Sequence, residues 1–273
     1  MVTDTPEVQD DEHAPASIRA LYDDIRGTLE TDVINLVFRR LAAIDGCLAQ
    51  VWERLRPAYR DGTLDALGAD LLSAVQPLPQ VSLPAAVLQA VALDPGERAQ
   101  ICAVVAAYNR NNARNLIAFK ALLVAGGPAH ESARVATRLS SGQVSAIPPL
   151  PALKDLPLSS RELLAALNAL GEAGSPAVVA GLFRHLAHWP GALVLAAGLL
   201  TPLHGLGWLA QRTEAVTNAA NRMARELPAS MRDPAAITGS AAGVMPLIDS
   251  TIPKMIPVGL VLDGAFRFNQ ANI

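Results

Sequence analysis

The apolar residues along the chain follow the spacing of amphipathic helices. In one stretch, Leu41, Leu48, Val51 and Leu55 recur at intervals of three, four and seven residues, which places them on one face of a helix. The alternation of apolar and polar residues and the Asn-Gly turns that are typical of β-hairpins are absent from the sequence. The pattern therefore predicts an all-α protein.

One apolar stretch carries an unusual number of asparagines. The segment AYNRNNARNLIAF, residues 107–119, holds Asn109, Asn111, Asn112 and Asn115. Asparagine is a poor helix former because its short amide competes for the hydrogen bonds of the backbone. Two interpretations are open: a fraying helix end in water, or amides that face a site needing uncharged donors and acceptors.

Two segments 145 positions apart resemble each other. FRRLAAIDGCLAQVWERLRP (residues 38–57) and FRHLAHWPGALVLAAGLLTP (residues 183–202) are identical at eight of 20 positions, where about two matches are expected by chance for this composition. Helix starts at Ser17 and Ser160 precede the two copies, the second with Ser159 and Glu162 spaced as a capping box. The chain therefore contains an internal repeat.

The repeat defines the domain organisation that we expect. Asp94-Pro95 and Asp233-Pro234 each look like an N-cap followed by proline at the first helical position. We predict an acidic disordered tail (1–14), a first helical repeat (15–127), a linker rich in Pro, Gly and Ser (128–157), a second helical repeat (158–268) and a short C-terminal tail (269–273). The two tandem repeats are expected to pack as an intramolecular pseudo-dimer, with sites at their interface.

Composition and charge limit the kinds of binding partner that we expect. The chain is 51% hydrophobic and 17% charged with a net charge of −3, so it has no basic surface for nucleic acid or an anionic membrane. The uncharged stretch Trp189–Ala210 is long enough to cross a bilayer, but Pro202 and His204 favour a buried helix that ends near Pro202. Cys47 and Cys102 form neither a zinc motif nor a disulfide framework, and a reducing cytoplasm is expected.

Five short motifs in order resemble a known family. They are YDDIRGTL from Tyr22, FRRLAAIDG from Phe38, AYNRNNARNLI from Ala107, LFRHLAHWP from Leu182 and LDGA from Leu262. Together they resemble the group I 2-haloacid dehalogenases, the halocarboxylic acid dehydrogenase DehI family, over essentially the whole chain. The resemblance implies an all-helical pseudo-dimer and hydrolysis of a carbon–halogen bond next to a carboxylate, without metal or cofactor, by an aspartate-activated water between the repeats.

The resemblance also implies site residues, and here the chain departs from the family. Asn112 matches the family's second participant, with Asn109 beside it. Leu182 stands at the position of the catalytic aspartate, and leucine cannot accept a proton. Val33 and Leu36 replace aromatic side chains that line the family's pocket.

Other residues offer substitutes for the missing base. His185 follows Leu182 by three residues on the same helical face, and Asp249, expected to be buried at a helix interface, is a second candidate. Each also has an ordinary structural explanation, as a packing histidine or a local cap. Arg39 and Arg184 occupy equivalent repeat positions and suit either a substrate carboxylate or structural pairing.

Two functions therefore remain open. The first is a 2-haloacid dehalogenase-like hydrolase that acts on a small carboxylic acid, and the alternative is a binding or structural protein on the same scaffold. His185, His188 and His204 lack a further ligand at metal-site spacing, so no metal and no cofactor is expected. The oligomeric state, a homodimer included, stays open.

Overall fold

The computed structural model describes residues 14–79, 81–125, 147–171, 178–239 and 241–267. Throughout these ranges the regular secondary structure is helical, and no strand occurs in them, which confirms the predicted all-α class. The predicted C-terminal tail, nearly all of the N-terminal tail and residues 128–146 of the predicted linker lie outside the described residues.

The helices come in two successive series. The first contains α1 (Ala16–Leu29), α2 (Leu36–Ala42), α3 (Cys47–Arg60), α4 (Thr63–Ser73), α5 (Ala85–Ala90) and α6 (Pro95–Leu123). The second contains η1 (Leu153–Asp155), α7 (Leu158–Ala169), α8 (Gly181–Leu186), α9 (Pro190–Gly205), α10 (Trp208–Ala224), η2 (Ala229–Met231), α11 (Ala235–Thr238), α12 (Ala241–Pro246), η3 (Leu247–Thr251) and α13 (Ile252–Phe266). Of these, η1 and η2 are 3₁₀ turns and η3 is a π-helical turn.

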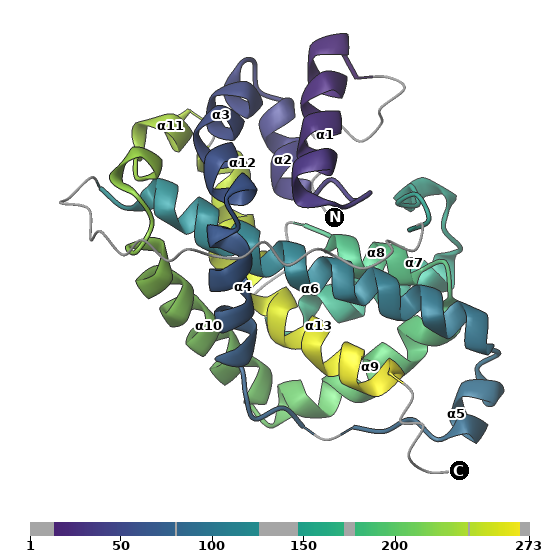
Figure 1. Cartoon of the computed structure of the whole chain (residues 1–273). Coiled ribbons are helices and arrows are strands. Elements are labelled where there is room, and N and C mark those ends of the chain that lie inside the picture. The colour runs from purple at the N-terminus through teal and green to yellow at the C-terminus, as the bar shows by residue number, and fades with distance from the viewer. Residues whose placement is uncertain (1–13, 80, 126–146, 172–177, 240, 268–273) are drawn as a thin grey trace.

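Helix α6 runs through the centre of the molecule, and α13 packs lengthwise against it (Figure 1). Helix α6 begins at the predicted cap: Asp94 Oδ1 accepts from the Glu97 backbone N–H at 2.8 Å, and Glu97 Oε2 accepts from the Asp94 backbone N–H at 2.9 Å. All four asparagines lie in its interior and are buried. The interpretation of this segment as a fraying helix end is therefore wrong.

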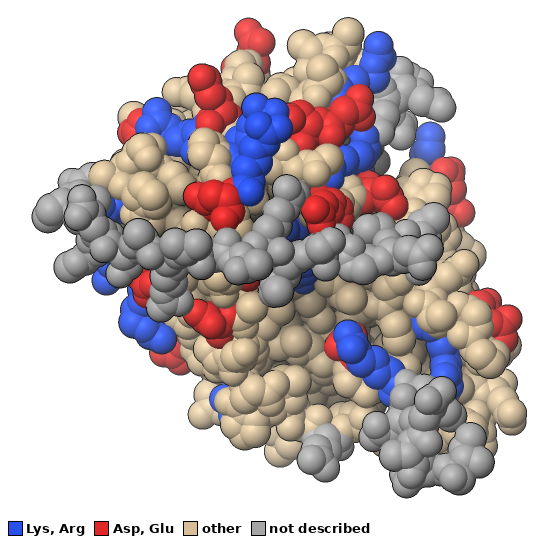
Figure 2. All heavy atoms as spheres, in the orientation of Figure 1, with Lys and Arg blue, Asp and Glu red and all other residues tan. Residues whose placement is uncertain are grey.

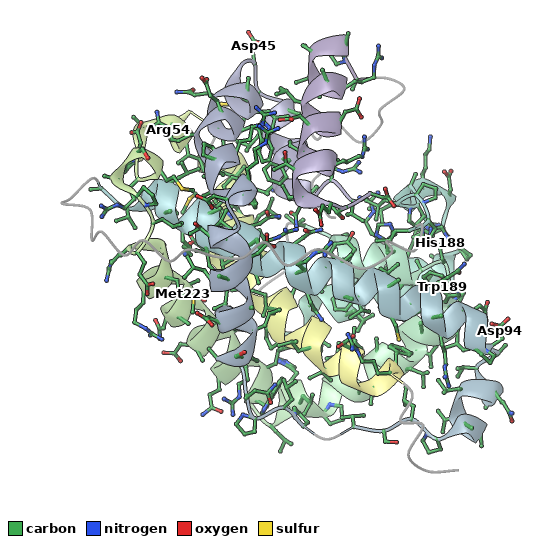
Figure 3. The ribbon with its side chains drawn as sticks, in the orientation of Figure 1. Asp45, Arg54, Asp94, His188, Trp189 and Met223 are labelled. Carbon is green, nitrogen blue, oxygen red and sulfur yellow. The ribbon has the colours of Figure 1, made fainter. Side chains whose placement is uncertain are left out.

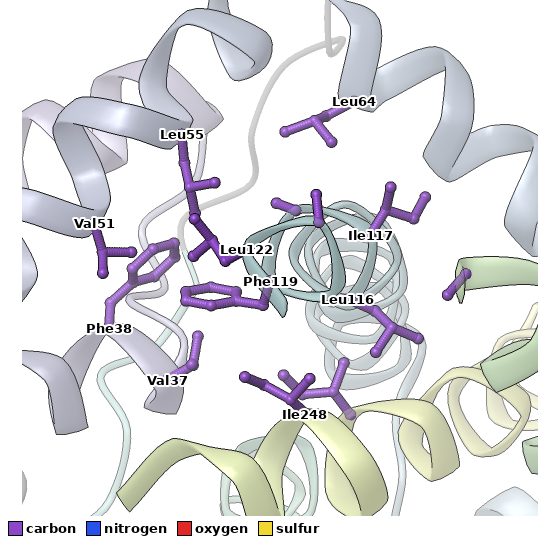
Figure 4. Close-up of a cluster of buried hydrophobic side chains, with 14 of the residues drawn as sticks. Val37, Phe38, Val51, Leu55, Leu64, Leu116, Ile117, Phe119, Leu122 and Ile248 are labelled. Atoms are coloured by element: carbon purple, nitrogen blue, oxygen red, sulfur yellow. The ribbon is translucent and has the colours of Figure 1, made fainter. Parts of the chain in front are cut away.

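Both sequence halves contribute to two hydrophobic cores. The first core joins α1–α4 to the C-terminal half of α6 and to residues from the end of α10 through the start of α13. The second joins α7–α9 to α5, the N-terminal half of α6 and the remainder of α13. In the first core, Phe38 of α2 lies against Phe119 of α6, with ring centroids 5.5 Å apart (Figure 4). The halves are thus interlocked.

Two helix ends differ from the sequence-based expectation. Helix α7 begins at Leu158 after Pro157 and has no side-chain cap, so the capping box predicted at Ser159 is wrong, because Ser159 already lies inside the helix. Asp233 Oδ1 does accept from the Ala235 backbone N–H at 3.0 Å, but α11 continues for only four residues. Helix α9 carries Pro202 in its last turn and ends at Gly205.

The most apolar helices form part of the folded core. Within the described residues, one helix, Ala242–Phe266, is long and apolar enough to cross a membrane, and 72% of its most apolar window is buried inside the protein. The uncharged stretch singled out above is divided between α9 and α10, which are bent by 83°. Lys, Arg, Asp and Glu side chains are interspersed over the α1–α3 region of the surface (Figure 2). The apolar helix Ala242–Phe266 thus contributes mainly to the interior of the fold.

Candidate functional site

A small cavity lies where α2, α6, α8 and the η3–α13 junction meet. The space open to the centre of a water molecule is about 30 Å³, and by this measure one water needs roughly 10–15 Å³. Its polar lining residues are Asn35, Arg39, Tyr108, Asn112, Arg184 and Thr251. The rest of the wall is mostly aliphatic and includes Leu36, Leu150 and Leu182. The cavity therefore suits a small ligand with one polar and one apolar part.

Several of the residues singled out from the sequence meet in this cavity. Asn112 on α6 shares the wall with Leu36 and Arg39 on α2 and with Leu182 and Arg184 on α8. Residues far apart in the chain are thus brought to one wall. The remaining candidates, Val33, Asn109, His185 and Asp249, do not belong to the described lining of this cavity.

Asn35, which the sequence analysis missed, fixes the orientation of Asn112. Asn35 is the N-cap of α2, and its Oδ1 accepts from the Val37 backbone N–H at 3.2 Å. Its Nδ2 therefore faces Asn112 and donates to Asn112 Oδ1 at 3.0 Å. The cap settles both amide orientations, which distances alone leave ambiguous. The available signal was an asparagine directly before an apolar helical run.

This orientation decides what Asn112 offers to a ligand. Its Oδ1 is engaged by Asn35, and its Nδ2 has no acceptor among the residues that the structure describes. The side chain is almost entirely buried yet lines the cavity. Asn112 Nδ2 is therefore suited to donate to an anionic or carbonyl oxygen, or to a halide, in the cavity.

His185 lies behind Tyr108 and outside the described cavity lining. Its Nε2 is 2.9 Å from the Pro148 carbonyl oxygen, which can only accept, so Nε2 carries the proton. Its Nδ1 then accepts from the Tyr108 hydroxyl at 2.8 Å. Both ring nitrogens are thus engaged by the protein, and His185 has no free lone pair for a water in the cavity.

The electrostatic surroundings keep both groups of this pair uncharged at neutral pH. Burial lowers the pKa of His185 to about 4, against the hydrogen bond to Pro148, and the charges of His188, Arg39 and Arg184 lower it further. Burial raises the pKa of the Tyr108 hydroxyl, while the two arginines oppose this rise. The neutral Tyr108–His185 pair is therefore the form present near pH 7.

The two arginines place positive charge on the cavity wall. Arg39 Nε donates to the Ile34 carbonyl oxygen at 2.9 Å, and Arg184 Nη2 donates to the Pro151 carbonyl oxygen at 3.0 Å. These contacts hold each guanidinium in a defined position. Both charges act on Tyr108 and His185, so the wall beside this pair carries guanidinium groups.

No Asp, Glu or His belongs to the described lining of the cavity. Leu182 is buried and packs into the second core, so its side chain offers only apolar surface. Asp249 on η3 is half exposed, and its Oδ1 accepts from Lys120 Nζ at 2.7 Å. The expectation that Asp249 is buried is wrong, because the π-helical turn directs it towards the end of α6 and the solvent.

Val33 and Asn109 have packing environments of their own. Val33 belongs to the second hydrophobic core. Asn109 lies against Gly259 of α13 so closely that a Cβ on that glycine would overlap with Asn109 Oδ1. In the described part of the chain, no group of three or more His, Cys, Asp or Glu residues is placed to hold a metal ion.

A proline-rich strap, residues 147–152, covers the outer side of α8. The carbonyl oxygens of Pro148, Pro149 and Pro151 accept from His185, His188 and Arg184, the second at 2.8 Å. Leu150, in the middle of the strap, contributes to the cavity wall. His188 and Trp189 lie at the corner where α8 turns into α9 (Figure 3). The sequence predicted a connection here but not its contacts.

The fold is that of solved D-2-haloacid dehalogenases. A mutant in complex with D-2-CPA has a TM-score of 0.73 and 19% identity, covering 95% of this chain and 94% of its own. Another mutant has a TM-score of 0.73 and 17% identity, and a complex with L-LA has 0.73 and 18%; in both cases coverage is 97% of this chain and 96% of the other. By sequence, no protein-family model and no curated protein matches this chain.

Proposed function

We propose that the protein binds a small 2-substituted carboxylic acid in the cavity between α2, α6 and α8. The observation that carries this proposal is the pair of arginines, Arg39 and Arg184, on one small cavity together with the Nδ2 donor of Asn112. Guanidinium groups bind carboxylates through charge-assisted hydrogen bonds. The aliphatic wall, Leu182 included, accommodates the remainder of the acid.

We further propose that the cavity lies at the axis of a pseudo-dimer. Three features support this arrangement: the eight identities between residues 38–57 and 183–202, the similar order of the two helix series and the sharing of both cores by both halves. Arg39 and Arg184 stand at equivalent positions of the repeat. A carboxylate on the axis would then contact one arginine from each half, as expected of a ligand at an isologous interface.

Hydrolysis of a 2-haloacid is the second candidate, and the fold shared with D-2-haloacid dehalogenases favours it. The described cavity lining lacks a carboxylate or an imidazole that could accept the proton of an attacking water. A positioned general base contributes about 10²- to 10⁴-fold to a rate. Leu182 lies in the wall, and Asn112 Oδ1 is engaged by Asn35. We therefore propose ligand binding as the first candidate function and hydrolysis as the second.

Calorimetric titration with D- and L-2-chloropropionate tests the binding proposal. We expect the wild type to bind at least one enantiomer and Arg184→Gln to bind it about tenfold or more weakly, because a hydrogen bond to a charged group contributes about 1.5–3 kcal/mol. Arg267→Gln is the matched control, since Arg267 is exposed at the end of α13 and its loss should leave the affinity unchanged. Binding that is equal in all three proteins would contradict the proposed anchor.

Chloride release from the same acids separates the two candidates. For a binding protein, the wild type releases no chloride above the buffer rate, whereas Leu182→Asp places a carboxylate on the cavity wall and is expected to gain release. Leu182→Asn controls for the polar replacement without the charge. Rapid release by the wild type would establish the hydrolase, and failure of the wild type to bind any of the acids would reject both candidates.

A further inference from the structure

The hydroxyl proton of Tyr108 is committed to His185. The Pro148 carbonyl oxygen requires the N–H on His185 Nε2, which leaves only a lone pair on Nδ1. The Tyr108 hydroxyl, 2.8 Å from Nδ1, is then the donor in that contact. Because the imidazole is neutral at pH 7, this direction of donation is fixed. The strap, acting through His185, thus determines the direction in which the Tyr108 hydroxyl donates its proton.

Tyr108 therefore offers only an acceptor to the cavity. A phenol has one proton and its oxygen can also accept, and the proton is used by His185. The hydroxyl end of the side chain lies beside Gly181, which itself forms part of the wall: a Cβ on Gly181 would be 2.7 Å from the Tyr108 hydroxyl oxygen. Thr251, the other hydroxyl of the wall, can donate or accept and so accommodates either kind of ligand group.

We propose that the ligand carries a hydrogen-bond donor next to its carboxylate, which makes 2-hydroxycarboxylates the preferred class over 2-halocarboxylates. This inference rests on the proposed function. In the arrangement, Arg39 and Arg184 bind the carboxylate, Asn112 Nδ2 donates to an oxygen of the ligand, and the 2-hydroxyl group donates to Tyr108. A halogen cannot donate, so a 2-haloacid leaves the Tyr108 oxygen without a donor inside a site from which water is displaced.

A site built to hydrogen-bond a hydroxyl rejects an analogue without it more strongly than an aliphatic pocket rejects a group of the wrong size. For one buried hydrogen bond between neutral groups we expect about a tenfold difference in the dissociation constant. The preference for a 2-hydroxy acid should depend on Tyr108 and not on the arginines, because all the acids compared carry the same carboxylate.

The test compares the affinities of lactate, 2-chloropropionate and propionate for the wild type by calorimetry, with both enantiomers of the first two. We expect one enantiomer of lactate to bind about tenfold more tightly than either other acid. Tyr108→Phe should reduce lactate affinity about tenfold and leave 2-chloropropionate affinity unchanged. Because this variant leaves His185 Nδ1 without its donor, its thermal unfolding is measured alongside.

A second variant perturbs the tyrosine without removing it. Gly181→Ala forces the Tyr108 hydroxyl to move and should also abolish the preference for lactate. Gly198→Ala is the matched control, because a Cβ there meets no atom within 4 Å on an exposed face of α9; it should behave as the wild type.

Each outcome decides the inference. Equal or tighter binding of 2-chloropropionate by the wild type overturns it while the proposed carboxylate site stands. A lactate preference that survives in both Tyr108→Phe and Gly181→Ala also overturns it, because another group would then accept the hydroxyl proton. If none of the three acids binds the wild type, the proposed function itself fails and the inference falls with it.

Discussion

Acidification should destabilise the fold through His185. The folded protein holds the pKa of this imidazole at about 4, against an ordinary value of 6.5. Between these two values the unfolded chain binds a proton that the folded chain does not. The free energy of unfolding therefore falls as the pH falls from about 6.5 towards 4, and the full contribution of His185 is present only above that window.

The structure sets the size of this effect. Each pKa unit corresponds to about 1.4 kcal/mol, so the full difference amounts to about 3 kcal/mol, of which about 2 kcal/mol is lost by pH 5. No discount for solvent screening is needed, because His185 is only 2% exposed. This loss is a substantial part of the 5–15 kcal/mol that is roughly typical for a folded domain.

Urea denaturation at pH 7.5 and pH 5.0 measures the effect. His185→Gln keeps an amide donor and acceptor but does not titrate, so its loss of stability between the two pH values should be about 2 kcal/mol smaller than that of the wild type. His204→Gln is the control, since His204 is exposed on α9. Equal losses in His185→Gln and the wild type would refute the assignment of a neutral buried imidazole.

Three further substitutions test packing and capping by denaturation. Arg114→Met leaves the Asp65 carboxylate, 12% exposed and 2.7 Å from Arg114 Nη1, without its partner and should cost about 3 kcal/mol; an unchanged midpoint would contradict this. Gly259→Ala drives a Cβ into Asn109 and should cost about 1–3 kcal/mol, most of which Asn109→Ala in the same chain should restore. Asp94→Ala removes the capping box of α6 and should cost about 0.5–2 kcal/mol, with the far-UV circular dichroism of the native state retained.

The sequence was most informative where the signal is local. Apolar spacing predicted the all-α class, and Asp94, Pro95 and Glu97 marked the start of α6 because a cap and its helix are adjacent in the chain. The motifs that resemble dehalogenases pointed to Asn112 and Leu182, which the structure places on the same cavity. These inferences require no knowledge of how the helices pack.

The contacts that define the cavity chemistry could not be predicted because they join distant segments. Asn35 and Asn112 are 77 residues apart, as are Tyr108 and His185. Local patterns say nothing about which side chains meet over that separation. The same limit explains Asp249, since sequence spacing does not show that a π-helical turn carries its carboxylate to the surface.

The first turn of α2 also controls the chemical character of a side chain on another helix. Aspartate caps helices as well as asparagine does, so Asn35→Asp would preserve α2 yet present an oxygen where Asn112 now meets an N–H. The Asn112 amide would then rotate and turn its carbonyl towards the cavity, so that it would offer the ligand an acceptor in place of a donor. A change at one helix cap, between two side chains of nearly equal size, would thus alter the hydrogen-bonding group that a different helix presents to the cavity.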